Sequence, residues 1–167
     1  MENLASMLGG IGFVGEALDA SAGHYAAGPD FLRLITFLGC SPVVNLGGTE
    51  HGPECRVRLP TPLAAPRFLN GANTKPPRCP ACRGELGTDA ALGRVWERDS
   101  GTTVVCPHCG ARTAVHLLDW RRTGAFVKTS IEITGIHESE AVPGEALLAA
   151  LESASGVDWD YCYLRRD

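Results

Sequence analysis

Two short stretches decide how the chain is organised: RCPACRGEL at residues 78–86 and VVCPHCGAR at residues 104–112. Each stretch contains two cysteines separated by two residues, a spacing that lets both sulfurs of a pair reach one metal ion. We expect the residues between the stretches to form a hairpin that brings the second pair back onto the first. The four cysteines that then match the ligand set of a tetrahedral metal site are Cys79, Cys82, Cys106 and Cys109.

The paired turns resemble the zinc-ribbon family, with its rubredoxin-like pair of cysteine knuckles, over about residues 78–118 of the 167-residue chain. The resemblance implies that the four cysteines are the metal ligands. The first turn departs from the pattern at Arg83, which stands where the second turn has Gly110, and Gly84 follows one position later.

Three chemistries could use these cysteines, and zinc binding is the one we expect. Iron in a rubredoxin-like site uses the same four sulfurs, because tetrahedral sulfur sites accept either metal. A dithiol-disulfide redox site at CPHC would need a helix directly after the motif, whereas Gly110 and the strand-like TAVHLL follow. Four protein sulfurs leave no open coordination position, so the ion should be structural rather than catalytic.

The composition is that of a globular protein, with 44% hydrophobic and 20% charged residues and no apolar run near the ~20 residues of a membrane span. A length of 167 residues predicts one domain with a small insert. The apolar amino terminus lacks the basic start of a signal peptide, so we expect a cytoplasmic protein. Seven cysteines, an odd number, favour metal binding over a disulfide framework.

Charge is distributed unevenly along the sequence. Residues 56–128 contain twelve basic and five acidic residues, a net charge of +7, whereas the flanks sum to -11. Tryptophans lie among the arginines of this region, a combination found at protein interfaces and on surfaces that stack nucleic-acid bases. The residues expected to form a partner-binding surface are Arg83, Arg94, Trp96, Arg98, Arg112, Trp120, Arg121 and Arg122.

The function that we expect is non-catalytic recognition, by an adaptor that docks an acidic protein through a basic, tryptophan-containing zinc ribbon. A nucleic-acid-binding regulator is the second interpretation, although such domains typically have a pI above about 9 and this chain has a pI near 5.7. An enzyme is the third, with Cys40 as nucleophile and His24, His51 or His137 as base, although we favour Cys40 as an inert thiol. A second metal site with His51 and Cys55 is a further hypothesis.

Hydrophobic periodicity predicts an α+β fold. The strands expected in the first two thirds of the chain, from their apolar patterns, lie at residues 31–38, 55–59, 94–98, 102–105 and 113–118. Residues 94–98 and 102–105 would form a hairpin around a turn at Asp99-Ser100-Gly101.

The carboxyl-terminal part predicts a strand at 126–134, a helix at 145–155 and a strand at 157–164. Together they would form a β-α-β crossover with parallel strands. Pro143 suits the first turn of the helix, and Gly156 suits the left-handed position just after its end.

We therefore expect an α+β core whose small mixed sheet has one covering helix and carries the zinc ribbon as an insert. The predicted boundaries are 1–60 for the amino-terminal part of the core, 61–77 for a proline-rich connection, 78–118 for the zinc-ribbon insert and 119–167 for the carboxyl-terminal part of the same core.

Overall fold

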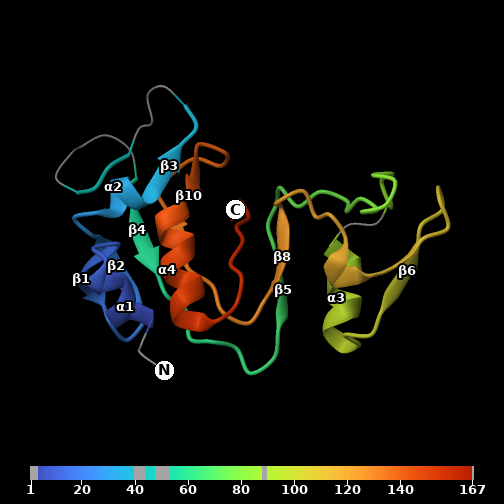
Figure 1. Cartoon of the computed structure of the whole chain (residues 1–167), viewed down its shortest axis with the longest axis horizontal. Coiled ribbons are helices and arrows are strands. Elements are labelled where there is room, and N and C mark those ends of the chain that lie inside the picture. The colour runs from blue at the N-terminus through green and yellow to red at the C-terminus, as the bar shows by residue number, and fades with distance from the viewer. Residues whose placement is uncertain (1–3, 40–43, 48–52, 88–89, 167) are drawn as a thin grey trace. The chain divides into compact units, whose positions relative to one another are not determined.

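The computed structural model describes residues 4–39, 44–47, 53–87 and 90–166. The chain forms two compact units, and each unit is built from two separate stretches of sequence (Figure 1). Unit 1 comprises Met1–Pro62 and Thr129–Tyr161, and unit 2 comprises Leu63–Lys128 and Cys162–Asp167.

Unit 1 contains a four-stranded antiparallel sheet in the order β1-β2-β4-β9. Its strands are β1 (Val14–Asp19), β2 (His24–Ala27), β4 (Arg56–Arg58) and β9 (Glu132–Thr134). Tyr25, Val57 and Ile133 lie opposite one another across β2, β4 and β9. Val57 is fully buried between two more exposed neighbours, which is the alternation of a half-exposed strand. The strand predicted at 55–59 is therefore confirmed.

Residues 31–38 form a short helix followed by a strand, and not the single strand that the sequence predicts. Helix α2 (Phe31–Leu34) precedes β3 (Ile35–Phe37), which pairs antiparallel with β10 (Ala141–Pro143). Phe31 and Leu34 lie one helical turn apart and are both buried, whereas the two residues between them are exposed. The amide of Leu34 donates to the carbonyl of Asp30, so this end of the apolar run closes a helical turn.

Two further helices, α1 (Leu4–Gly10) and α4 (Glu145–Ser155), contribute to unit 1, and α4 matches the predicted helix in both bounds. Leu147 and Leu151, one turn apart, bury its apolar face. Gly156 adopts a φ of 71° and its amide donates to the carbonyl of Glu152 at 2.7 Å, the left-handed cap predicted from the sequence. Pro143 instead lies in β10, before the helix. The buried core of unit 1 comprises Leu8, Phe13, Val14, Phe31, Leu34, Ile35, Cys55, Val57, Leu147 and Leu151.

The predicted β-α-β crossover is wrong, because no strand follows α4 in the described residues up to 166. Residues 157–164 alternate apolar and polar side chains but have no partner strand, and in unit 2 the amide of Tyr163 donates to the carbonyl of Arg122 at 2.8 Å. The strand predicted at 126–134 is interrupted, because β8 (Gly124–Val127) belongs to unit 2 and β9 belongs to unit 1. The named strands all pair antiparallel.

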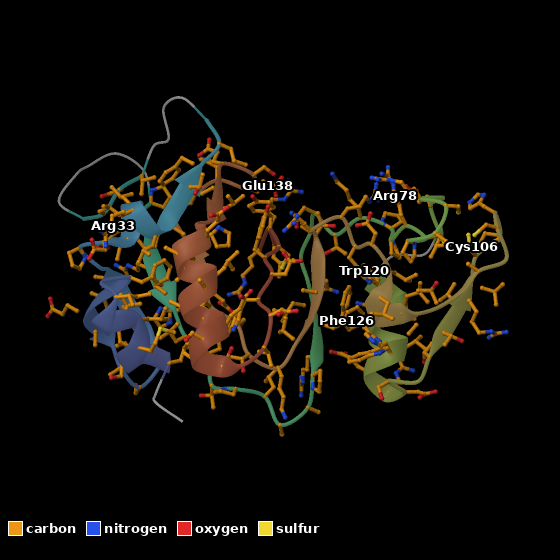
Figure 2. All side chains as sticks on the ribbon, viewed as in Figure 1. Arg33, Arg78, Cys106, Trp120, Phe126 and Glu138 are labelled. Atoms are coloured by element: carbon orange, nitrogen blue, oxygen red, sulfur yellow. The ribbon has the colours of Figure 1, made fainter. Side chains whose placement is uncertain are left out.

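In its described residues, unit 2 contains two antiparallel strand pairs, one α-helix and one 3-10 helix (Figure 1). Strand β5 (Arg67–Asn70) pairs with β8, and β6 (Thr103–Val105) pairs with β7 (Arg112–Ala114), which continues into the 3-10 helix η1 (Val115–Leu117). The strand predicted at 113–118 therefore ends after Ala114. The rings of Trp120 and Phe126 pack edge to face, 5.8 Å apart, in the core of this unit (Figure 2). The buried residues of that core are Phe68, Trp96, Val115, Leu118 and Trp120.

Residues 94–98 belong to helix α3 (Ala90–Arg98), so the predicted hairpin strand at this position is wrong. Leu92 and Trp96 are four residues apart and pack into the core of unit 2, while the arginines of the helix are exposed. Gly93 lies directly under the ring of Phe68, so that a methyl group at this position would overlap the ring. The close approach of helix and ring explains the glycine within the helix.

The predicted α+β class is confirmed, with helices packed against small antiparallel sheets. In the part of the chain that the structure describes, every helix is too short or too polar to cross a membrane.

Candidate metal centre

The two cysteine turns of unit 2 bring four sulfur atoms together. The Sγ atoms of Cys79, Cys82, Cys106 and Cys109 all lie within 4.8 Å of one another. Cys79 and Cys109 are separated by 3.8 Å, and Cys82 and Cys106 by 3.6 Å. Among the described residues this is the group of side chains that could hold a metal ion, and its four cysteines form no disulfide.

These separations fit a tetrahedral sulfur site. Four sulfurs bound to one ion at about 2.3 Å in a regular tetrahedron lie about 3.8 Å from each other. The measured values of 3.8 and 3.6 Å agree with that geometry, whereas a disulfide would bring two sulfurs to about 2.05 Å. The four side chains are therefore close enough together to hold a single ion.

Both turns are closed by the same backbone hydrogen bonds. The amide of Arg83 donates to the carbonyl of Cys79 at 2.8 Å, and the amide of Gly110 donates to the carbonyl of Cys106 at 2.9 Å. Arg83 and Gly110 also share the left-handed conformation, with φ values of 62° and 75°. The departure of the first turn from the glycine pattern thus leaves its backbone geometry intact.

The two cysteine turns also resemble each other in the hydrogen bonds that their sulfurs accept. The amide of Gly84 donates to the sulfur of Cys82 at 3.4 Å, and the amide of Ala111 donates to the sulfur of Cys109. Such N–H donors stabilise negative charge on sulfur, in the free thiolate and in a metal-bound one.

The surroundings of the cluster shift the pKa of Cys106 and that of Cys109 in opposite directions. Burial acts to raise the pKa of Cys106, but N–H groups of His108 and Cys109 point at its sulfur and lower that pKa to about 6. At Cys109 the amide of Ala111 acts to lower the pKa, while the sulfur of Cys82 and burial outweigh it and raise the pKa to about 12. One thiolate therefore forms readily and opposes the next, a conflict that a bound cation would remove.

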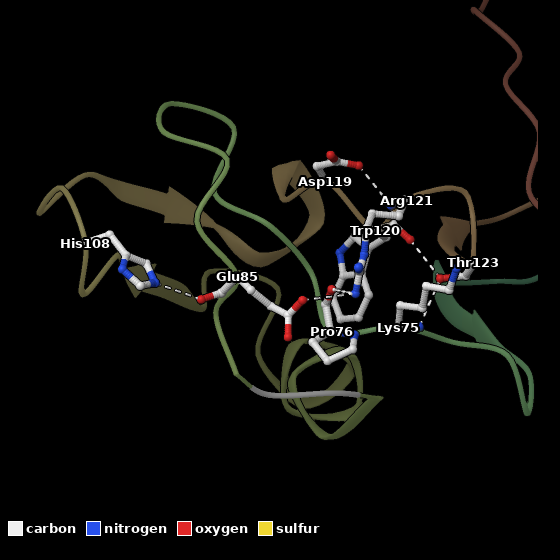
Figure 3. A network of polar contacts seen from close by, with 8 residues as sticks. All are labelled: Lys75, Pro76, Glu85, His108, Asp119, Trp120, Arg121 and Thr123. Atoms are coloured by element: carbon white, nitrogen blue, oxygen red, sulfur yellow. Dashed lines mark hydrogen bonds and ion pairs between the residues drawn. The ribbon is translucent and has the colours of Figure 1, made fainter.

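His108 connects the two turns (Figure 3). A methyl group on Gly84 would come within 2.4 Å of Cδ2 of the His108 ring, so the ring lies directly over this glycine. Nε2 of His108 lies 3.0 Å from the carbonyl oxygen of Glu85 and acts as the donor. The sequence signal for this contact is Gly84, the glycine that follows Arg83, because only a residue without a side chain leaves room for the ring.

A polar network continues from Glu85 to the turn at residues 120–123 (Figure 3). The Glu85 carboxylate lies 3.6 Å from Nη2 of Arg121, and the same nitrogen donates to the carbonyl of Pro76 at 2.6 Å. The amide of Arg121 donates to a carboxylate oxygen of Asp119 at 2.8 Å. Nε of Arg121 is buried and has no hydrogen-bond partner among the described residues.

The tryptophans assigned to the partner-binding surface are in the core, which corrects that prediction. Trp96 is 7% exposed and Trp120 is 5% exposed. Their indole N–H groups donate inside unit 2, from Trp96 to Nδ1 of His116 at 3.2 Å and from Trp120 to the carbonyl of Val115 at 3.1 Å. The few large apolar residues of this unit are needed to form its core, so they do not supply an exposed stacking surface.

The predicted arginines occupy several elements of unit 2. Arg94 and Arg98 lie on α3, Arg112 lies on β7, and all three are exposed. Arg83 follows the first cysteine pair and is exposed. Arg121 and Arg122 form a turn, in which Arg121 is half-buried and Arg122 exposed.

The net charges of the two units have opposite signs. Unit 2 contains twelve basic and six acidic residues, a net charge of +6, and unit 1 contains three basic and thirteen acidic residues, a net charge of -10. Each of the three arginines of unit 1 forms an ion pair with an acid: Arg33 with Asp30, Arg56 with Glu54 and Arg58 with Glu132. Basic side chains of unit 2 without an ion pair to any described residue include Arg67, Lys75, Arg83, Arg94, Arg98 and Arg165.

The structure gathers none of the other candidate residues that it describes into a metal-binding group. Cys40 and His51 lie outside the described residues. Cys55 is buried in the core of unit 1, where burial, with a smaller contribution from Glu54, raises its pKa to about 11. His24 lies half-buried in β2, and His137 lies exposed in the turn before β10.

Comparison with protein-family models, with curated proteins and with solved structures finds no match to this chain.

Proposed function

We propose that unit 2 is a non-catalytic recognition module whose fold is stabilised by a structural zinc ion bound to Cys79, Cys82, Cys106 and Cys109. The observation that carries this proposal is the convergence of four sulfurs within 4.8 Å, with separations of 3.6 and 3.8 Å that suit one tetrahedral ion. Because protein sulfurs would fill all four positions, the ion would have no site for water or substrate.

Zinc is favoured over iron because it is the usual ion of closed four-cysteine sites, although iron could bind the same sulfurs. Elemental analysis of the purified full chain should find about one zinc per molecule in a colourless solution. Cys109→Ser should lower the zinc content strongly, and Cys162→Ser, a matched control outside the cluster, should not. A coloured, iron-containing preparation would contradict the choice of metal.

The partner that we propose is an acidic protein surface. Unit 2 carries a net charge of +6, and several of its exposed basic side chains form no ion pair with the described residues. Complementary charge of this kind accelerates and orients association between proteins. The burial of Trp96 and Trp120 argues against nucleic acid, because single-strand binding relies on exposed aromatic rings that stack on bases.

The biological role would be that of an adaptor or assembly factor. We place it in the cytoplasm, because reduced cysteines that bind a metal persist in a reducing compartment.

A pull-down from the native cell tests the class of partner. The zinc-loaded full chain serves as bait, in one arm treated with nuclease and one untreated, and each captured protein is then purified and its affinity measured at increasing salt. We expect capture to survive nuclease and the purified partner to bind with a shallow salt dependence. Loss of capture after nuclease, with a steep dependence on salt, would instead identify a nucleic-acid-binding protein.

A further inference from the structure

Arginines of unit 2 adopt a backbone conformation that normally favours glycine. Among the described residues, the non-glycine positions with positive φ are Arg83 at 62°, Arg121 at 53°, Arg122 at 56° and Ser139 at 67°. The left-handed region is unfavourable for side chains with a Cβ atom, because the Cβ crowds the following carbonyl. Three of these four positions are arginines, and all three lie in unit 2.

The turn around Arg83 does not require an arginine. Gly110 occupies the equivalent position of the second turn, with the same closing hydrogen bond and a similar φ. The Arg83 side chain is exposed and forms no hydrogen bond or ion pair with the described residues. The local backbone would therefore favour glycine at this position, and it gives no reason for the guanidinium group of Arg83.

Arg121 and Arg122 are the central residues of a second turn, closed by a hydrogen bond from the amide of Thr123 to the carbonyl of Trp120 at 3.0 Å. Positive φ at both central residues is the geometry of a type I′ turn, in which Asn-Gly is the usual pair. The backbone around this turn is fixed, because the Thr123 hydroxyl accepts from the amide of Lys75 at 3.0 Å. Glycine or asparagine would adopt this backbone at a lower cost than two arginines, although at Arg121 the hydrogen bond to the carbonyl of Pro76 offsets part of that cost.

Glu85 links the two turns. Glu85 follows Arg83 by two residues, and its carboxylate lies 3.6 Å from the guanidinium of Arg121 (Figure 3). This carboxylate is half exposed and shows that a carboxylate can approach the arginine turn. The guanidinium fork suits carboxylates, because it can donate two parallel hydrogen bonds to one acid group.

We propose that Arg83, Arg121 and Arg122 form the contact site for an acidic peptide segment of the partner, and that Glu85 competes with that segment for Arg121. This inference rests on the proposed function, of which it names the contact residues and the ligand chemistry. Residues at functional sites often retain strained backbone conformations that sequence changes could relieve. Retention for binding would explain the unfavourable backbone at Arg83 and Arg122, and at Arg121 it would act beside the hydrogen bond to Pro76.

Fluorescence anisotropy with the zinc-loaded full chain tests the site. The probe is a labelled ten-residue peptide that alternates glutamate and glycine, and a labelled single-stranded oligonucleotide is the comparison. The double variant Arg83→Gly/Arg122→Gly should weaken peptide binding at least about tenfold, while its melting temperature is unchanged or higher. Glu85→Gln, which keeps the carbonyl that His108 contacts, should strengthen binding severalfold.

The single variants Arg83→Gly and Arg122→Gly are compared with Arg94→Ala, a charge-matched control on the ordinary helical backbone of α3, which should change the affinity less than either. A second double variant, Arg83→Asn/Arg122→Asn, removes the guanidinium groups with a residue that tolerates positive φ. It should lose binding in the same way as the glycine variant.

The outcomes separate the two proposals. If the wild-type chain does not bind the peptide, the proposed acidic partner is wrong and the site falls with it. If the wild type binds the peptide and both double variants bind it equally well, the acidic partner stands but the three-arginine site is wrong. The site is also wrong if Arg94→Ala loses as much affinity as the single glycine variants. A fall in melting temperature in both double variants would make the arginines structural and would also overturn the site. Tighter binding of the oligonucleotide, dependent on the same arginines, would overturn the peptide as ligand.

Discussion

The imidazole ring of His108 covers the Cα atom of Gly84, so that a residue of the second cysteine turn occupies the space where a side chain of the first would stand. A Cβ atom on Gly84 would meet Cδ2 of His108 at 2.4 Å, which is closer than two carbon atoms approach in folded proteins. The two turns are thus packed against each other directly, in addition to any ion they share.

Gly84→Ala should destabilise the zinc-loaded protein by about 1–3 kcal/mol, because the new methyl group displaces the imidazole. His108→Ala alone should cost about 0.5–1.5 kcal/mol through the lost hydrogen bond to Glu85. The double variant should lose less stability than the two single variants together, because the small residue at position 108 leaves room for the methyl group. Thermal unfolding of the four proteins measures this coupling. Additive losses would show that the ring and the glycine do not touch.

Removal of the metal should unfold unit 2 around the cysteine turns, because structural zinc contributes about 10–16 kcal/mol in small zinc-binding peptides. Trp96 and Trp120 lie in the core of this unit, so a chelator should shift their fluorescence to the red. The third tryptophan, Trp159, belongs to unit 1, and Trp159→Phe is therefore the control that isolates the signal. Restoring zinc should reverse the shift. An unchanged spectrum in the presence of chelator would contradict a structural role for the ion.

Arg83 and Gly110 offer a matched pair of backbone substitutions. Arg83→Gly should stabilise the protein by about 1 kcal/mol because glycine accommodates the positive φ. Gly110→Ala should destabilise it by about 1–2 kcal/mol for the same reason, since no atom lies within 4 Å of the added methyl group. Chemical denaturation at saturating zinc measures both changes. Two shifts of the same sign would contradict the structural equivalence of the turns.

The buried thiol of Cys55 should make the folded protein less stable at alkaline pH. Its pKa in the folded protein is raised from 9.0 to about 11 by burial, so the folded state holds its proton where the unfolded state has released it. The free energy of unfolding should therefore fall as the pH rises from 9.0 towards about 11, and should be unaffected by this group below that range. The comparison is between the wild type and Cys55→Ala, both loaded with zinc. Equal slopes in this pH window would show that the thiol does not contribute.

The features that could be predicted from the sequence are those set by local chemistry. The spacing within each cysteine pair determines which sulfurs converge, and α4 has strong helix formers followed by Gly156 at its left-handed cap. The helix at Ala90–Arg98 was missed because the strand interpretation began at Arg94. Leu92 and Trp96, the pair that reveals the helical period, fall on the two sides of that boundary.

The remaining errors concern partners that are distant in sequence. Residues 157–164 have the alternation of a strand, but a strand also needs a neighbour, and Tyr163 instead donates to the carbonyl of Arg122. The tryptophans beside arginines suggested a surface, because sequence neighbours do not reveal that Trp96 and Trp120 meet Phe126. Burial of this kind follows from the fold of the whole unit and not from the adjacent residues.

The division of each unit between two stretches of sequence bears on the order of events during translation. The fourth sulfur of the centre is available once Cys109 has left the ribosome, whereas β9, β10 and α4 are synthesised later. Domains generally fold as units while the chain is made. If the centre binds an ion as proposed, the nascent chain would capture it while the earlier-made strands of unit 1 still lack their last partners, and cellular metal supply would be an early determinant of productive synthesis.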